Sequence, residues 1–223
     1  MKVTIQMKDR LFLSGQKYDI LVGIVDGRFE MIFNILDLDL NFESSFNSAC
    51  YQGYNGDYNI NEGKLKLKEI QINLDDTDIL INGVKAIKQK TIMEYYANKY
   101  ANGVDVSRNG VETDDLSNLS FFNCRFENIN IDINFTGDII LGYGVGENKE
   151  FYLKDGLEAW INMYEKLMKL TIKEGKVILF EELNSEDVDK IKKEELRIHK
   201  EAIKLLREED QGIQLQQNTL GYV

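Results

Sequence analysis

The chain has 223 residues, of which 43% are apolar and 29% are charged, a balance that is typical of folded globular proteins. Its 27 basic and 38 acidic residues give a formal net charge of −11, which disfavours nucleic acid and anionic membrane surfaces as partners. This length fits one large β-rich domain, or one domain with an appendage.

The chain has few of the residues that build metal centres and nucleophilic sites. Its two cysteines, Cys50 and Cys124, have no metal-binding spacing, and His199 is its only histidine. We therefore expect no metal site, no cofactor and no identifiable catalytic residue. Isolated cysteines favour a reducing, cytoplasmic setting, and the sequence has neither a signal-peptide pattern nor a run of apolar residues long enough to span a membrane.

Strands and hairpins are predicted for the first part of the chain, residues 2–43. Asp26-Gly27 is a two-residue hairpin signal between two apolar segments. From residue 36 to 43, apolar residues alternate with polar ones that include Asp37 and Asp39, so the polar side chains share one face of a strand. We interpret this face as solvated, and a carboxylate site that includes Asp37 and Asp39 is the alternative.

A second hairpin is predicted around Asn61-Glu62-Gly63, with strands over residues 52–60 and 64–70. In its second strand, Leu65, Leu67 and Glu69 are expected on one face and three lysines on the other. The chain contains no proline and is rich in Asn, Ile and Lys, which indicates an A+T-rich bacterial genome. Its turns must therefore be formed by Gly, Asn and Asp.

Tyr51, Tyr54 and Tyr58 cluster at the start of this hairpin. The period of two places Tyr54 and Tyr58 on one face and Tyr51 on the other. Tyrosine serves both sheet packing and recognition, because it combines a large ring with a polar tip. Packing is the interpretation that we favour, and a binding surface that also includes Gln52 is the alternative.

The middle of the chain combines one helix with further strands. Helical spacing of apolar residues predicts a helix over 85–101, and strict alternation predicts a strand over 129–135. The glycines at 142, 144 and 146 lack the spacing of a dinucleotide-binding motif and are interpreted as a flexible turn.

A third hairpin is predicted around Lys173-Glu174-Gly175, and it echoes the second one. A shift of 112 residues aligns Ile60, Glu62, Gly63, Lys64, Leu67 and Glu69 with Ile172, Glu174, Gly175, Lys176, Leu179 and Glu181. Many well-formed hairpins share such residues, so duplication and convergence both remain open.

The last part of the chain has the periodicity of an amphipathic helix over residues 184–210, followed by a tail over 211–223 that we expect to be frayed. Asn184 or Ser185 can cap this helix. Two roles remain open for it: a lid packed on the sheet of residues 1–183, or a dimer contact.

Three blocks of the sequence resemble an uncharacterised bacterial β-rich family. They are CYQGYNGDYNINEGKLKLKEI, NFTGDIILGYG and MYEKLMKLTIKEGKVI, the last of which matches a Tyr-Glu-x-x-Leu-x-Leu-x-Ile-x-x-Gly pattern through Tyr164, Glu165, Met168, Leu170, Ile172 and Gly175. Gln52 stands where the family commonly has arginine. The resemblance implies no activity, although related small acidic proteins often resemble immunity or accessory proteins of bacterial toxin systems.

These observations predict a β-rich α+β fold, in which antiparallel hairpins form a curved sheet or sandwich with one inserted helix and a C-terminal helix. The leading functional hypothesis is a non-enzymatic acidic binding module, in particular an immunity-type inhibitor of a basic protein, as a monomer or homodimer. A carboxylate-based enzyme such as a hydrolase and a module that dimerises through the C-terminal helix are the alternatives. The candidate binding residues are Asp37, Asp39, Tyr51, Gln52, Tyr54, Tyr58, Tyr164 and Glu165.

Overall fold

The computed structural model describes residues 8–38, 53–101, 118–145, 161–194, 196–198, 200, 201 and 204. It has the predicted β-rich α+β architecture, with a mostly antiparallel sheet, helix α1 (Ile92–Ala101) and a C-terminal helix that begins at residue 185. None of the helices within these ranges is long and apolar enough to cross a membrane.

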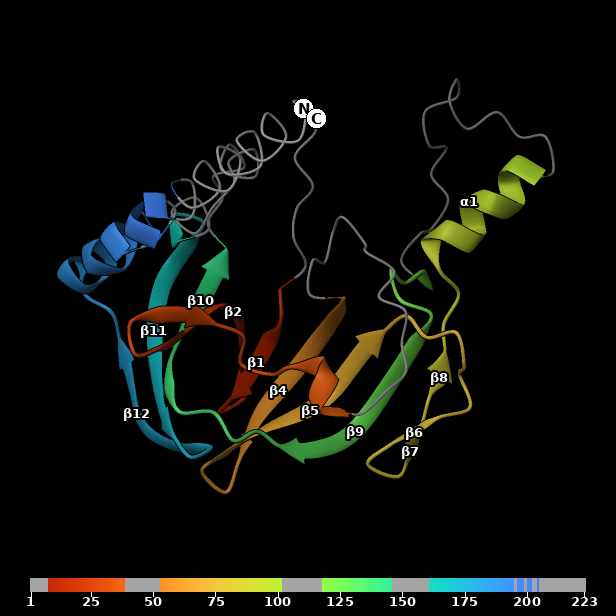
Figure 1. Ribbon diagram of the computed structural model, residues 1–223, viewed down its shortest axis with the longest axis horizontal. Helices are drawn as coiled ribbons and strands as arrows, with labels where there is room; N and C mark the ends of the chain where they lie inside the picture. The colour runs from red at the N-terminus through yellow and green to blue at the C-terminus, as the bar shows by residue number, and fades with distance from the viewer. Residues whose placement is uncertain are drawn as a thin grey trace, which may run out of the picture.

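One ten-stranded sheet forms most of the fold (Figure 1). Its strand order is β12-β11-β10-β2-β1-β4-β5-β9-β8, with β3 paired to β2, and β1 and β4 are parallel neighbours. A separate two-stranded sheet pairs β6 with β7. The strands are β1 (Arg10–Leu13), β2 (Gln16–Val25), β3 (Arg28–Glu30), β4 (Tyr54–Asn61), β5 (Lys64–Ile72), β6 (Leu80–Ile81), β7 (Val84–Lys85), β8 (Ile87–Lys88), β9 (Cys124–Asp132), β10 (Gly137–Val145), β11 (Tyr164–Lys173) and β12 (Lys176–Glu182).

Three of the hairpins turn where the sequence predicts. Asp26 precedes Gly27 in the β2–β3 turn, and the turns of β4–β5 and β11–β12 each contain a glutamate followed by a glycine. Both residues of each turn have positive φ, which is the geometry of the two-residue turns that match the twist of antiparallel strands.

The tips of the β4–β5 and β11–β12 hairpins meet and join the two regions of the sheet. The N–H of Leu65 donates to the carbonyl of Gly175, and the N–H of Val177 donates to the carbonyl of Gly63, both at 2.8 Å. These two bonds are related by the same 112-residue shift as the sequences, so the contact has local twofold symmetry. The equivalence ends there, because β4 runs parallel to β1 whereas β11 runs antiparallel to β10. The structure therefore supports a repeated hairpin, not a repeated half of the chain.

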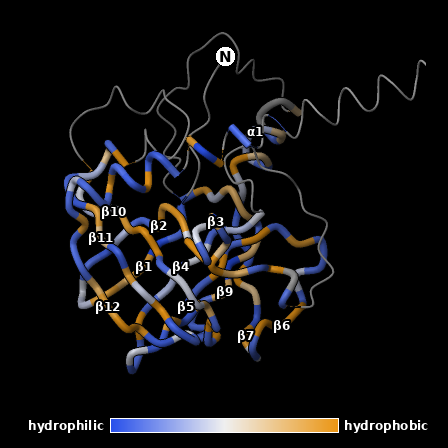
Figure 2. Tube along the Cα trace, turned by 60° about the vertical axis from the view of Figure 1, so that its left-hand side comes forward, coloured by the Kyte–Doolittle hydropathy of each residue, from blue (hydrophilic) through white to orange (hydrophobic). Residues whose placement is uncertain are grey.

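The main apolar core fills the concave side of the sheet. Apolar and polar residues alternate along its strands (Figure 2), and the apolar set includes Tyr54 and Tyr58, which are 1% and 0% exposed. A short 3-10 helix, η1 (Ile35–Leu38), lies within the curve in Figure 1. The hydroxyl of Tyr54 donates to the carbonyl of Phe33 at 2.6 Å and so fixes the segment that leads into η1.

The alternation over residues 36–43 predicted a strand, and this prediction is wrong for residues 36–38. Phe33, Ile35 and Leu38 all pack into the concave core, a spacing that a tight turn permits and a flat strand does not. Asp37 therefore projects to solvent from η1. Residues 39–43 lie outside the described ranges.

A bulge in β5 reverses the predicted orientation of Glu69. Leu67 pairs with Tyr58 in the core, whereas Glu69 pairs with Asp57, and the register shifts between the two pairs. Lys68 is the extra residue, so Leu67 and Glu69 lie on opposite faces of the sheet. The prediction that Glu69 shares a face with the leucines is wrong.

The C-terminal helix packs on the convex side of the sheet, against β10 and β11 (Figure 1). The side-chain oxygen of Asn184 accepts from the N–H of Asp187 at 3.0 Å, which is the predicted N-cap. Val188 and Ile191 then pack against a second apolar cluster that includes Leu167. This is the lid arrangement, one of the two that the sequence left open.

Helix α1 begins later than its apolar periodicity predicts. Val84–Lys85 and Ile87–Lys88 form β7 and β8, and the helix starts at Ile92. A capping box precedes it: the Thr91 hydroxyl accepts from the Glu94 N–H at 3.1 Å, and the Glu94 carboxylate accepts from the Thr91 N–H at 3.0 Å. The periodicity missed this boundary because Ile87 belongs to β8.

Candidate functional site

A row of charged side chains crosses the convex face of the sheet. Asp19 of β2, Arg10 of β1, Asp57 of β4, Glu69 of β5 and Glu127 of β9 are successive neighbours in the strand register. Together with Arg125, also on β9, these residues are called the charged row. The row lies on the face opposite the apolar core, because its members alternate along their strands with buried residues such as Leu11, Tyr58 and Phe126.

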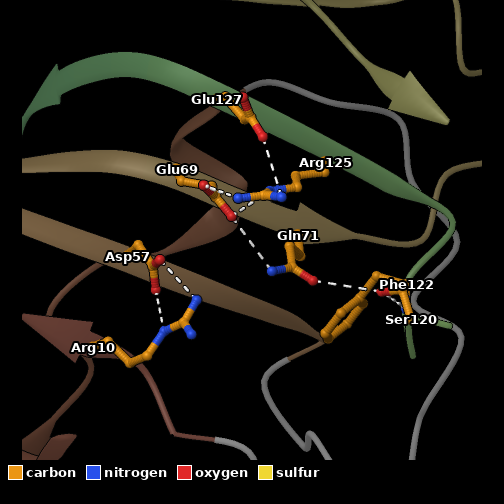
Figure 3. Close-up of polar contacts among 8 residues, drawn as sticks. All are labelled: Arg10, Asp57, Glu69, Gln71, Ser120, Phe122, Arg125 and Glu127. Atoms are coloured by element: carbon orange, nitrogen blue, oxygen red, sulfur yellow. Dashed lines mark hydrogen bonds and ion pairs between the residues drawn. The ribbon is translucent and has the colours of Figure 1, made fainter. Parts of the chain in front are cut away.

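The two arginines of the row hold two carboxylates in fork-like pairs (Figure 3). Nε and Nη2 of Arg10 donate to the two oxygens of Asp57 at 2.5 and 2.7 Å, and the same atoms of Arg125 donate to Glu69 at 2.6 and 2.7 Å. Asp57 and Glu69 are 8% and 7% exposed. Carboxylates this deeply buried need such bidentate partners to remain ionised.

Polar contacts continue from Glu69 and Arg125 (Figure 3). Nη1 of Arg125 lies 3.1 Å from a carboxylate oxygen of Glu127, and the amide of Gln71 donates to Glu69 at 3.4 Å. The hydroxyl of Ser120 lies 3.5 Å from the amide oxygen of Gln71. The row is therefore linked to the chain segment that precedes β9.

The pKa shifts in the row follow from burial and pairing. Burial raises the pKa of Asp57, against the opposing hydrogen bonds and charge of Arg10. The hydrogen bonds to Glu69 raise the pKa of Arg125. Both oxygens of Asp57 and of Glu69 accept from a guanidinium, and this bidentate geometry fixes each carboxylate against a neighbouring strand. The geometry suits cross-linking of strands better than acid–base catalysis.

Tyr164 extends the row toward β11. Its hydroxyl donates to Asp19 at 2.7 Å, and its ring crosses β10 at Gly142. A Cβ atom at Gly142 would lie 2.5 Å from this ring, so only glycine leaves room for it. The prediction of a flexible glycine-rich turn is wrong for Gly142 and Gly144, which lie inside β10.

Lys8 lies beside this tyrosine at the start of β1. Its ammonium nitrogen is 5.6 Å from the centre of the Tyr164 ring. Burial lowers the pKa of Lys8 to about 7, and the negative charge of Asp19 opposes the shift. A lysine that titrates in this range is a common feature of functional sites, but burial alone also produces it.

Replacing Lys8 with methionine tests the cost of burying its charge. Between about pH 7 and pH 10.5 the unfolded chain binds a proton that the folded chain does not, so the stability of the wild type rises with pH in this window. Below about pH 7 both the folded and the unfolded chain bind this proton, so burial of the charged ammonium destabilises the folded wild type by its full amount. We expect Lys8→Met to be more stable than the wild type at neutral pH, and its advantage to shrink by about 1–2 kcal/mol when the pH is raised by two units.

Urea unfolding at a series of pH values measures this effect. Lys8→Arg is the matched control, because a guanidinium stays protonated throughout the range and this variant gains nothing from the higher pH. A stability difference between Lys8→Met and the wild type that is the same at every pH would contradict the shifted pKa.

The structure does not bring the sequence-predicted site residues together. Tyr54 and Tyr58 are in the concave core, which confirms packing as their role, and burial raises the pKa of Tyr58 well above its usual value. Tyr164 joins the convex charged row, and Glu165 is exposed beside Gly144. Tyr51, Gln52 and Asp39 lie outside the described residues.

Sequence reasoning missed the charged row. The alternation of Arg10 and Asp57 with apolar neighbours indicates that each lies on the polar face of its strand. It does not indicate their partners, because the ion pairs Arg10–Asp57 and Arg125–Glu69 join residues 47 and 56 positions apart. The β5 bulge also moved Glu69 to the unexpected face.

The described residues contain no group of three or more His, Cys, Asp or Glu side chains that could hold a metal ion. Comparison of the chain with protein-family models, with curated proteins and with solved structures found no match, so its function has to be argued from its own residues.

Proposed function

We propose that the chain is a non-enzymatic binding module that recognises a basic protein through acidic segments of its sequence, chiefly residues 102–117 and 146–160. The observation that carries this proposal is the uneven distribution of charge. The described residues include 22 basic and 24 acidic side chains, a net charge of −2 (22 − 24), while the remaining residues carry −9 (5 − 14). Most of the formal net charge of −11 thus comes from residues outside the described ranges.

Two of these segments carry more acidic than basic residues. Residues 102–117 follow α1 and carry four acidic residues and one basic residue, and residues 146–160 follow β10 and carry four acidic and two basic residues. In Figure 1, α1 lies at the upper right of the molecule and β10 at the upper left, and both are on the side away from the tips of the β4–β5 and β11–β12 hairpins. Clustered charge of one sign accelerates encounter with a partner of the opposite sign.

The charged row supports a non-enzymatic role. Its buried carboxylates, Asp57 and Glu69, are each held by both of their oxygens, which favours a structural part for them over the catalysis of a carboxylate hydrolase. The C-terminal helix packs Val188 and Ile191 against the sheet. These apolar side chains are therefore not exposed for a dimer contact through this helix, which disfavours the dimerisation alternative. If the partner is an enzyme with an anionic substrate, the module would inhibit it by covering its basic site.

A pair of matched variants tests the proposal. Two of the four acidic side chains of segment 102–117 are neutralised in Asp114→Asn/Asp115→Asn. The same number of charges is removed at the hairpin tips in Glu62→Gln/Glu174→Gln, where both glutamates are exposed. Immobilised wild-type protein is expected to capture a basic protein from an extract of the cells that make it. Capture should weaken as salt is raised, because the contact is electrostatic.

Calorimetry with the captured protein then decides the location of the contact. We expect the Asp114→Asn/Asp115→Asn variant to bind about tenfold more weakly, which corresponds to about 1.4 kcal/mol, and the hairpin-tip variant to bind like the wild type. Equal binding by both variants would contradict the proposed surface. Salt-insensitive capture would contradict the proposed chemistry.

A further inference from the structure

We draw no further inference here: the strongest candidate, the exposed apolar side chains of Ile178, Leu179 and Phe180 on the edge strand β12, carries nothing because nothing in the structure shows what covers them.

Discussion

Replacing Gly175 with alanine is expected to destabilise the protein by about 2–5 kcal/mol, whereas the same change at Gly63 is expected to cost about 1–2 kcal/mol. The two glycines occupy the same position in the two echoing hairpins, with φ of 74° and 73°. Both substitutions therefore incur the strain of a side chain at positive φ. Only at Gly175 would the new Cβ also meet a backbone atom, the carbonyl oxygen of Ile133, at 2.6 Å.

The difference between the two variants isolates the effect of the close approach of Gly175 to Ile133, the residue that follows β9. Gly63 is exposed and has open space where a Cβ would lie, so Gly63→Ala serves as the internal control for backbone strain. Chemical unfolding of both variants with a common denaturant slope measures the difference. If the two alanine variants were equally stable, the close approach of the β11–β12 tip to the end of β9 would be wrong.

Arg125→Ala is expected to destabilise the fold by about 2–3 kcal/mol, because it leaves the buried carboxylate of Glu69 without its guanidinium partner. The lower part of the usual range applies, since the side chain of Arg125 is itself 36% exposed. Adding Glu69→Gln should restore part of the loss, because the amide does not carry a buried charge. Urea unfolding of the two single variants and the double variant gives the coupling between the residues.

Lys166→Ala is the control for this experiment. Lys166 and Glu182 also form a cross-strand ion pair, at 3.0 Å, but both side chains are more than half exposed. Water and salt screen such a pair, so its removal should leave the unfolding midpoint unchanged. Similar effects of Arg125→Ala and Lys166→Ala would show that burial does not distinguish the charged row from the rest of the surface.

The charged row changes how the acidity of this protein is understood. Its two buried carboxylates, Asp57 and Glu69, are paired with Arg10 and Arg125, so these two contribute to the cohesion of β1, β4, β5 and β9 and not to a free acidic surface. Most of the excess of acidic residues is contributed by residues outside the described ranges. The same chain thus uses carboxylates in two ways: paired across the sheet, and, in our proposal, as the recognition surface for a basic partner.

The contact between the hairpin tips also offers a physical reason for the similarity between the two hairpin sequences. Sequences that form similar turns expose similar edges, and two such edges can pair symmetrically, as the Leu65–Gly175 and Val177–Gly63 bonds do. Positive φ at the second turn position favours glycine, so Gly63 and Gly175 would be preserved whether the hairpin was duplicated or not.

The sequence by itself determined the elements whose cause is local. The hairpins at Gly27, Gly63 and Gly175 follow from residues that accept positive φ, and the start of the C-terminal helix follows from the cap at Asn184. Period two placed Tyr54 and Tyr58 on one face, and the size of their rings favoured the packing that their burial shows. These features depend on residues a few positions apart, so a single segment contains the information.

Only the tertiary structure decided the rest, because it depends on which strands become neighbours. The bulge at Lys68 directs the side chain of Glu69 to the convex face of the sheet. Glu69 then pairs with Arg125, which lies 56 positions away in the sequence. Residues 35–38 turn because the concave face has to be covered, although their alternation fits a strand equally well. The alternation of apolar and polar residues shows that each strand has a core face and a polar face. The neighbouring strands and their register determine which side chains meet on each face.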